Sequence, residues 1–271
     1  MLRQIVKALL ESGPSRAILS FIGKSAGGRR ILNGVSGTRA VFSTFEQGWA
    51  AARRTGLPGH GDPSQVALHL ELAKSLRPSD YPALFWLREA ANDGKLSVFD
   101  FGGNAGNLFY SYSPYLKSFG ALDWTVFDIP PVLEEGRRIA AERNAAGLTF
   151  ASSPSELRAD QVLLASGFLH YWKGTIAEFL QQFPIRPRHV IVNRTPISER
   201  QAPFVVVQQT RTVAHPCVVR NADALISEFA ALRYSLVDRW AAPELRIILP
   251  LFPEHSVAHY GGFYFRLDPS R

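Results

Sequence analysis

The chain has 271 residues, 46% of them hydrophobic and 20% charged, and this composition excludes a predominantly disordered protein. Its single cysteine, Cys217, excludes a disulfide framework and a cysteine-rich zinc site. The formal charge of +7 is concentrated in residues 1–60, which hold nine basic and two acidic residues, so no nucleic-acid partner is expected for the neutral remainder.

Residues 1–43 are expected to form a basic helical arm. Apolar residues such as Leu2, Ile5 and Leu9 recur at helical spacing. Under one hypothesis this helix packs on the rest of the protein, and under the other it lies on an anionic membrane or a protein partner. A signal peptide is not expected, because Lys7 and Glu11 interrupt the apolar run. The expected location is therefore the cytoplasm, at the membrane face under the second hypothesis.

The next part of the chain, residues 44–94, is expected to be a helical cap on the acceptor side of the site. Residues 26–40 are rich in glycine, serine and arginine and predict a linker before it. The apolar spacing and the breaks around proline and glycine predict three helices, at 44–56, 64–77 and 81–91.

Residues 95–271 are expected to form one α/β domain. Apolar strands alternate with helices, which favours βαβ units and a parallel sheet. The predicted strands are 96–102, 124–129, 148–152, 161–168 and 189–195, and the helices are 131–145 and 174–183.

After residue 200 the pattern predicts more strands and one helix near 222–232. The strands are expected at 204–210, 234–240, 245–250 and 262–267, the last two as an antiparallel pair at the sheet edge. The predicted fold is thus Rossmann-like α/β, mostly parallel, with an antiparallel C-terminal edge and an N-terminal helical extension.

A glycine-rich loop follows the first strand of this domain. Glycine allows unusual backbone angles and a close approach of a ligand to the main chain. The spacing does not fit the dinucleotide fingerprint G-x-G-x-x-G, and no Gly-Lys-Ser/Thr follows as in a P-loop. It fits Asp-x-Gly-x-x-x-Gly, formed by Asp100, Gly102 and Gly106.

A second acid, Asp128, ends the next strand 28 residues after Asp100. An acid at that place can accept both hydroxyls of a ribose. A carboxylate at the end of the first strand can reach a ligand ammonium group. The pair therefore predicts an adenosyl ligand with an amino-acid tail and no pyrophosphate, which is S-adenosylmethionine.

Three segments carry a resemblance to a known family. VFDFGGNAGNLFY (98–110) resembles motif I of class I S-adenosylmethionine-dependent methyltransferases. WTVFDIPPVLEEGRRIA (124–140) and LLASGFLHYWKG (163–174) are similar to the second and fourth strand segments of small-molecule O-methyltransferases. The resemblance covers roughly residues 45–267. The cofactor-binding positions that it implies, together with the residue reasoning above, are Asp100, Gly102, Gly103, Asn104, Gly106, Asp128, Ile129, Ser152, Ser166 and Phe168.

More narrowly, the chain resembles a family of bacterial methyltransferases whose genes often lie among those for surface polysaccharides or other glycans. This resemblance implies a sugar or glycan precursor as methyl acceptor. The chain departs from motif I at Asn104, which stands in place of a third glycine. It also has Ser152 near the place where related enzymes carry an acid that contacts adenine.

Four residues are candidates for the chemistry or for the acceptor pocket. His170 follows the fourth strand and can serve as a base, and Tyr110 opens the helix after the glycine loop. Arg194 follows the fifth strand and can meet an acidic acceptor, and His215 is expected to line the acceptor pocket. For each, a structural role is the alternative. No metal is expected, because the region of His255 does not favour a helix that would bring it together with His259.

The predicted function is S-adenosylmethionine-dependent methyl transfer to a hydroxyl of a sugar, a glycan precursor or another small metabolite. Two alternatives stay open. One is an NAD(P)-dependent oxidoreductase on a similar sheet, and the other is a non-catalytic scaffold that keeps the methyltransferase fold.

Overall fold

The structure is a computed structural model, and it describes residues 40–59, 66, 69–71, 73–92, 94–119, 122–210, 212–249 and 252–268. The predicted arm helices and nearly all of the linker at 26–40 lie outside the described residues. The described chain divides into two compact units. We call residues 66–195, 223–244 and 260–268 the sheet unit, and residues 40–59, 196–222 and 245–259 the hairpin unit.

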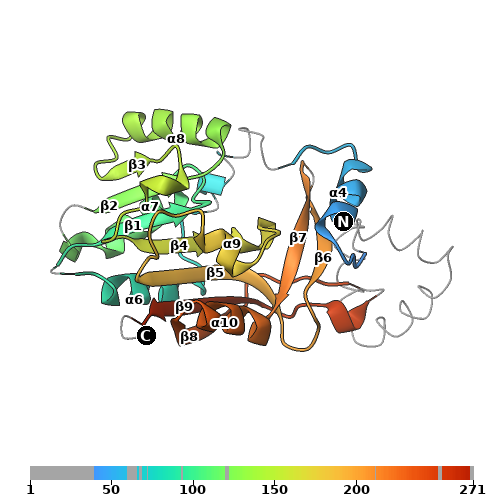
Figure 1. The fold of residues 1–271 in the computed structure, drawn as a ribbon. Helices are drawn as coiled ribbons and strands as arrows, with labels where there is room; N and C mark the ends of the chain where they lie inside the picture. The colour runs from blue at the N-terminus through green and yellow to red at the C-terminus, as the bar shows by residue number, and fades with distance from the viewer. Residues whose placement is uncertain are drawn as a thin grey trace. The chain divides into compact units, whose positions relative to one another are not determined.

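The sheet unit contains five parallel strands in the order β3-β2-β1-β4-β5 (Figure 1). They are β1 (Ser97–Phe101), β2 (Asp123–Phe127), β3 (Leu148–Phe150), β4 (Val162–Ser166) and β5 (His189–Ser198). In the centre of the sheet Asp100 is in register with Val126 of β2 and Leu164 of β4. The carboxyl ends of these strands therefore share one edge, and the Rossmann-like fold prediction is confirmed.

Apolar side chains on both faces of β1 explain its central place. All five of its residues are buried, a pattern typical of a parallel strand covered on both sides. One face contributes to a core that includes Val98, Trp124, Leu164 and Ile191. Trp124 has no exposed surface, and truncation of such a side chain to alanine costs roughly 3–5 kcal/mol.

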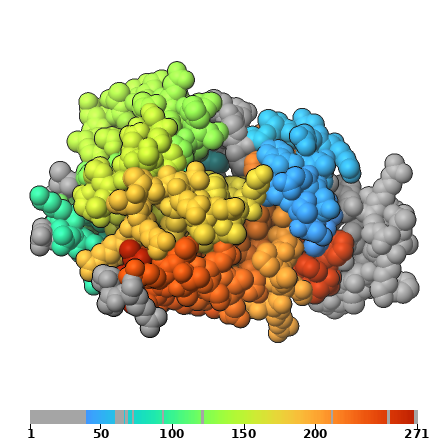
Figure 2. Space-filling view, in the orientation of Figure 1, coloured from blue at the N-terminus to red at the C-terminus, as the bar shows by residue number. Residues whose placement is uncertain are grey.

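Several helices accompany these strands: α6 (Asp80–Glu89), α7 (Asn107–Tyr112), α8 (Pro130–Glu142), α9 (Ile176–Leu180) and α10 (Ala222–Ala231). Pro130 begins α8, where a missing N–H has no cost. The helix buries Val132, Gly136 and Ile139 on one stripe. Its other face lies at the surface of the unit, in green in Figure 2, and carries the exposed Arg138.

The C-terminal strands β8 (Tyr234–Ala242) and β9 (Tyr260–Leu267) pair antiparallel, and β9 also pairs with β5. The predicted antiparallel C-terminal edge is confirmed, but the predicted partner of β9 is wrong. Residues 245–250 form no strand where described and contribute only a bridge from Ile247 to Val257. The partner is β8, and Gly262 of β9 lacks a side chain and so leaves room for the Trp240 indole on the facing strand.

The hairpin unit is built on β6 (Phe204–Gln209) and β7 (Ala214–Asn221), which pair antiparallel, with α4 (Phe45–Arg53) against them. Gly48 of α4 allows this approach, since a Cβ there would lie 2.8 Å from Val205. The sequence did not predict β7, because Pro216 argues against a strand interior. The last residues of β5 pair with β7 in this unit.

Among the predicted helices, 44–56 and 81–91 are confirmed as α4 and α6. The helix predicted at 64–77 extends too far. Residues 66 and 69–71 are helical, but 73–79 are turns and irregular chain, consistent with Pro78, which disfavours helical angles at Arg77. In the described parts of the chain, no helix is long and apolar enough to cross a membrane.

Candidate active site

A cavity of about 320 Å³ opens at the carboxyl edge of the parallel strands in the sheet unit. Open α/β sheets bind ligands at this edge, and the volume lies in the range of small-molecule sites. The lining is mostly apolar and aromatic, with one carboxylate and one guanidinium. It consists of Phe101, Gly102, Phe127, Asp128, Ile129, Pro130, Leu133, Arg137, Ser152 and Phe168.

The loop after β1 has a backbone that only a few residue types can adopt. Gly102 has a φ of +77°, and a Cβ on it would lie 2.7 Å from Phe168. Asn104 has a φ of +55°, which asparagine tolerates better than most residues. Its Oδ1 accepts a hydrogen bond of 2.9 Å from the N–H of Ala105. The loop can therefore approach a ligand closely with its main chain.

Asp128 stands at the tip of β2 and lines the cavity. Its two carboxylate oxygens accept hydrogen bonds from the backbone N–H groups of Asn104, at 2.8 Å, and Ile129, at 2.7 Å. Burial raises the pKa of Asp128, while these two hydrogen bonds lower it. The bonds fix the carboxylate at the cavity wall, where its remaining lone pairs can accept hydroxyl groups.

Asp100 is buried beneath the same loop. A Cβ on Gly103 would lie 2.5 Å from the Asp100 carboxyl carbon, so the loop rests directly on this side chain. Trp124 donates a hydrogen bond of 3.2 Å to Oδ2, and Oδ1 has no hydrogen-bond partner among the described residues. Burial is the main cause that raises the pKa of Asp100 to about 7, with the charge of Asp128 adding to it. The Asp100 side chain thus packs against Gly103 of the loop and does not line the cavity.

The structure brings half of the predicted cofactor residues into one cavity. Gly102, Asp128, Ile129, Ser152 and Phe168 line it, whereas Gly103, Asn104 and Gly106 form the adjoining loop. Ser166 does not line the cavity, and its Oγ lies 3.4 Å from Asn193 Nδ2.

Sequence reasoning missed five lining residues, which are Phe101, Phe127, Pro130, Leu133 and Arg137. Three of them could have been found, because Pro130, Leu133 and Arg137 follow the predicted ribose acid at helical spacing and share one face of α8.

None of the four predicted catalytic residues lines this cavity. His170 is buried in a short 3₁₀ turn, with its ring 4.0 Å from that of Tyr171. Tyr110 lies in a different cavity of about 590 Å³, beneath the Arg143 guanidinium. His215 belongs to the hairpin unit, where its ring lies 4.6 Å from that of Trp49.

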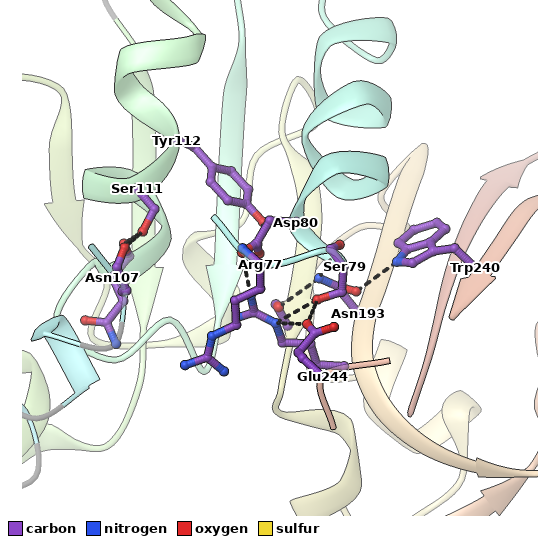
Figure 3. A network of polar contacts seen from close by, with 12 residues as sticks. Arg77, Ser79, Asp80, Asn107, Ser111, Tyr112, Asn193, Trp240 and Glu244 are labelled. Carbon is purple, nitrogen blue, oxygen red and sulfur yellow. Dashed lines mark hydrogen bonds and ion pairs between the residues drawn. The ribbon is translucent and has the colours of Figure 1, made fainter. Parts of the chain in front are cut away.

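Arg194, the fourth candidate, belongs to a buried polar network in the sheet unit. Figure 3 labels its partners Asp80 and Ser79. Its guanidinium donates 2.6 Å to Asp80 Oδ2 and 3.0 Å to Ser79 Oγ. Tyr112 donates 2.6 Å to the other Asp80 oxygen, and Ser79 Oγ donates to Glu244. Arg194 is thus held in an ion pair with the buried Asp80 carboxylate.

Asn193 connects the network to the end of β4. Its side chain donates 3.2 Å to the Ser79 carbonyl and accepts 3.0 Å from Trp240 Nε1, and it is in register with Ser166. The network therefore lies at the carboxyl ends of β4 and β8, beside the middle of the longer strand β5. In the parts of the chain that the structure describes, no group of histidine, cysteine or acidic residues could hold a metal ion.

Comparison with known proteins gives matches of structure alone. No protein-family model matches the chain, and no curated protein matches it. Among solved structures it is similar to the 1,6-didemethyltoxoflavin-N1-methyltransferase of Burkholderia thailandensis, with 18% identity, a TM-score of 0.49, and coverage of 71% of this chain and 80% of that one.

It is also similar to the magnesium protoporphyrin IX methyltransferase of Synechocystis PCC 6803, with 14% identity, a TM-score of 0.44, and coverage of 74% and 80%. For the CcbJ methyltransferase of Streptomyces caelestis the identity is 12%, the TM-score 0.46, and the coverage 70% and 90%.

Proposed function

We propose that this protein is an S-adenosylmethionine-dependent methyltransferase that acts on a small molecule. The observation that carries the proposal is Asp128, held at the tip of β2 by two backbone N–H groups and facing a cavity beside the glycine loop. This placement suits the two hydroxyls of a ribose. Bound S-adenosylmethionine supplies a methyl group on a positively charged sulfur.

The remaining lining residues fit the rest of an adenosyl group. Phe168, Phe101 and Ile129 offer apolar surface to a flat base, and Ser152 offers a hydroxyl at its edge. The absence of side chains on Gly102 and Gly103 lets the loop pack directly on Phe168 and Asp100, with its main chain beside the cavity. The protein's contribution to methyl transfer is then to bind and orient the cofactor in a largely apolar site.

The proposed acceptor is a hydroxyl of a sugar, a glycan precursor or another small metabolite. The proposal for its class rests on the sequence resemblance described above. None of the four candidate catalytic residues lines the cofactor cavity, so we assign no base.

Calorimetric titration with S-adenosylmethionine and S-adenosylhomocysteine tests the proposed function, with NAD(P)H as a control ligand. We expect micromolar binding of the adenosyl ligands alone. The Asp128→Ala variant loses the ribose acceptor, and Gly102→Val adds a side chain against Phe168 at a positive φ, so both should bind at least tenfold more weakly. Asp160→Ala is the matched control, since Asp160 is 65% exposed and lies outside the cavity lining.

Two results contradict the proposal. Binding of NAD(P)H instead of the adenosyl ligands favours the oxidoreductase alternative. Failure of the wild-type protein to bind any of these ligands favours a non-catalytic scaffold.

A further inference from the structure

His69 lies on a short helical stretch that packs against the glycine loop. Val66 and Leu70 of this stretch are buried one turn apart, and they pack in one apolar cluster with Ala105 of the loop and with residues of α8. These apolar contacts hold the stretch against the loop. The place of His69 beside the loop therefore does not depend on its own side chain.

The contacts of the Asn104 side chain fix the orientation of its amide. Its Oδ1 accepts the hydrogen bond of 2.9 Å from Ala105, because a backbone N–H can only donate. Its Nδ2, which can also only donate, therefore faces His69 Nδ1 at 3.3 Å. His69 Nδ1 must then hold a lone pair, and the proton of the neutral ring belongs on Nε2.

The surroundings of His69 favour this neutral ring. Burial lowers its pKa below the ordinary value of 6.5, and the positive charge of Arg77 lowers it further. A protonated ring would turn Nδ1 into a second donor against the Asn104 amide. At neutral pH the ring is thus in the state that can accept the hydrogen bond.

The main chain of Asn104 carries this contact to the ribose acid. Its N–H donates 2.8 Å to Asp128 Oδ2, one of the two backbone hydrogen bonds that hold this carboxylate at the cavity wall. Asn104 has a φ of +55°, a backbone conformation that costs a residue with a side chain free energy. Hydrogen bonds of its side chain stabilise this conformation and so keep the N–H directed at Asp128.

We propose that His69 is a positioning residue of the cofactor site. Through the Asn104 side chain it holds the loop conformation in which the loop N–H meets Asp128, and it thereby raises the affinity for the adenosyl ligand. The inference rests on the proposed function. His69 does not line the cavity, so it acts on the ligand through Asn104.

Calorimetric titration of the full chain with S-adenosylhomocysteine tests this inference on two variants of His69. His69→Leu removes the acceptor of the Asn104 amide and should bind about 3- to 10-fold more weakly, as for loss of one hydrogen bond. His69→Asn places its Oδ1 near the position of Nδ1, so it should bind within about twofold of wild type.

A double-mutant cycle shows whether the effect passes through Asn104. Asn104→Gly removes the amide and supplies a residue that adopts positive φ readily. In that background His69→Leu should change the affinity by less than about twofold, because the partner of the ring is already absent.

The matched control is His189→Leu. His189 is also half-buried in the sheet unit, and its Nδ1 is 2.6 Å from the Tyr264 hydroxyl. It begins β5, at the end of the strand away from the cavity edge, so this variant should bind like wild type. Melting temperatures report that each variant is folded.

A second measurement needs no ligand. Long-range ¹H–¹⁵N NMR spectra of the histidine rings, assigned with His69→Asn, report which nitrogen of His69 carries the proton. We expect the Nε2–H form at neutral pH.

The inference is overturned if His69→Leu binds like wild type, if His69→Asn binds as weakly as His69→Leu, or if the ring proton lies on Nδ1. An equal effect of His69→Leu with and without the Asn104 side chain also overturns it. If wild type does not bind S-adenosylhomocysteine, the proposed function fails and this inference fails with it.

Discussion

Replacement of Asp100 by asparagine should make the ligand-free protein more stable at neutral and basic pH. Asp100 is 1% exposed, and its pKa is raised from 3.8 to about 7. At pH values between 3.8 and 7, a carboxyl whose pKa is raised by folding is protonated to a greater extent in the folded chain than in the unfolded chain. Its contribution to stability is therefore lost as the pH rises from 3.8 through 7.

The size of the effect follows from the two pKa values. Between pH 5 and pH 8, ionisation of Asp100 should lower the free energy of unfolding by roughly 2.5 kcal/mol. Asparagine stays neutral and can still accept the hydrogen bond from Trp124. The melting temperature of Asp100→Asn minus that of wild type should therefore grow by about 5–10 °C over this range.

Thermal melting by circular dichroism across pH 5–8, without ligand, measures this difference directly. The matched control is Asp160→Asn, because Asp160 is exposed at the surface, and its difference from wild type should stay flat. If Asp100→Asn and wild type show parallel pH profiles, Asp100 does not titrate in the folded chain as reasoned here.

Two further predictions concern the frame around the site. Gly147→Ala should lower the melting temperature by several degrees, because Gly147 has a φ of +87° and a Cβ would lie 1.9 Å from the Leu122 carbonyl oxygen. The control is Gly94→Ala, which has a similar φ but open space around it and should lower the melting temperature less. Equal losses in the two variants would contradict the steric argument. Tyr112→Phe should lose about 1.5–3 kcal/mol of stability in urea unfolding, because its hydroxyl donates to the buried Asp80 carboxylate. Tyr115→Phe is its exposed control, and a Tyr112→Phe variant as stable as this control would show that the buried hydrogen bond is dispensable.

Local patterns predicted the parallel sheet and the cofactor side of the site. The glycine loop, the acid at the end of β2 and the apolar strands each lie within a few consecutive residues, so they can be recognised in a single sequence. The predicted second-strand acid, Asp128, does line the cavity beside that loop. Strand ends agree within one or two residues for β1, β2, β3 and β4.

The buried polar network could not be predicted in the same way. Asp80 and Arg194 are 114 residues apart, and Ser79 and Glu244 are 165 apart. Only the fold brings them together, and no spacing in the sequence marks one as the partner of the other. The pairing of β8 with β9 was missed for a related reason, since residues 243–259 separate the two strands and no local pattern shows which earlier strand faces β9.

Asn104 has a further consequence for how this loop meets a ligand. A glycine at that place would sample many backbone angles in the unfolded chain and in a loosely closed loop. Asparagine samples fewer, and its side chain is tied to Ala105 and His69 while its N–H holds Asp128. Much of the conformational entropy of this loop is thus given up during folding, before a ligand arrives. Association with a nucleoside-like ligand should accordingly need little rearrangement of the loop and lose less entropy than it would with a glycine there.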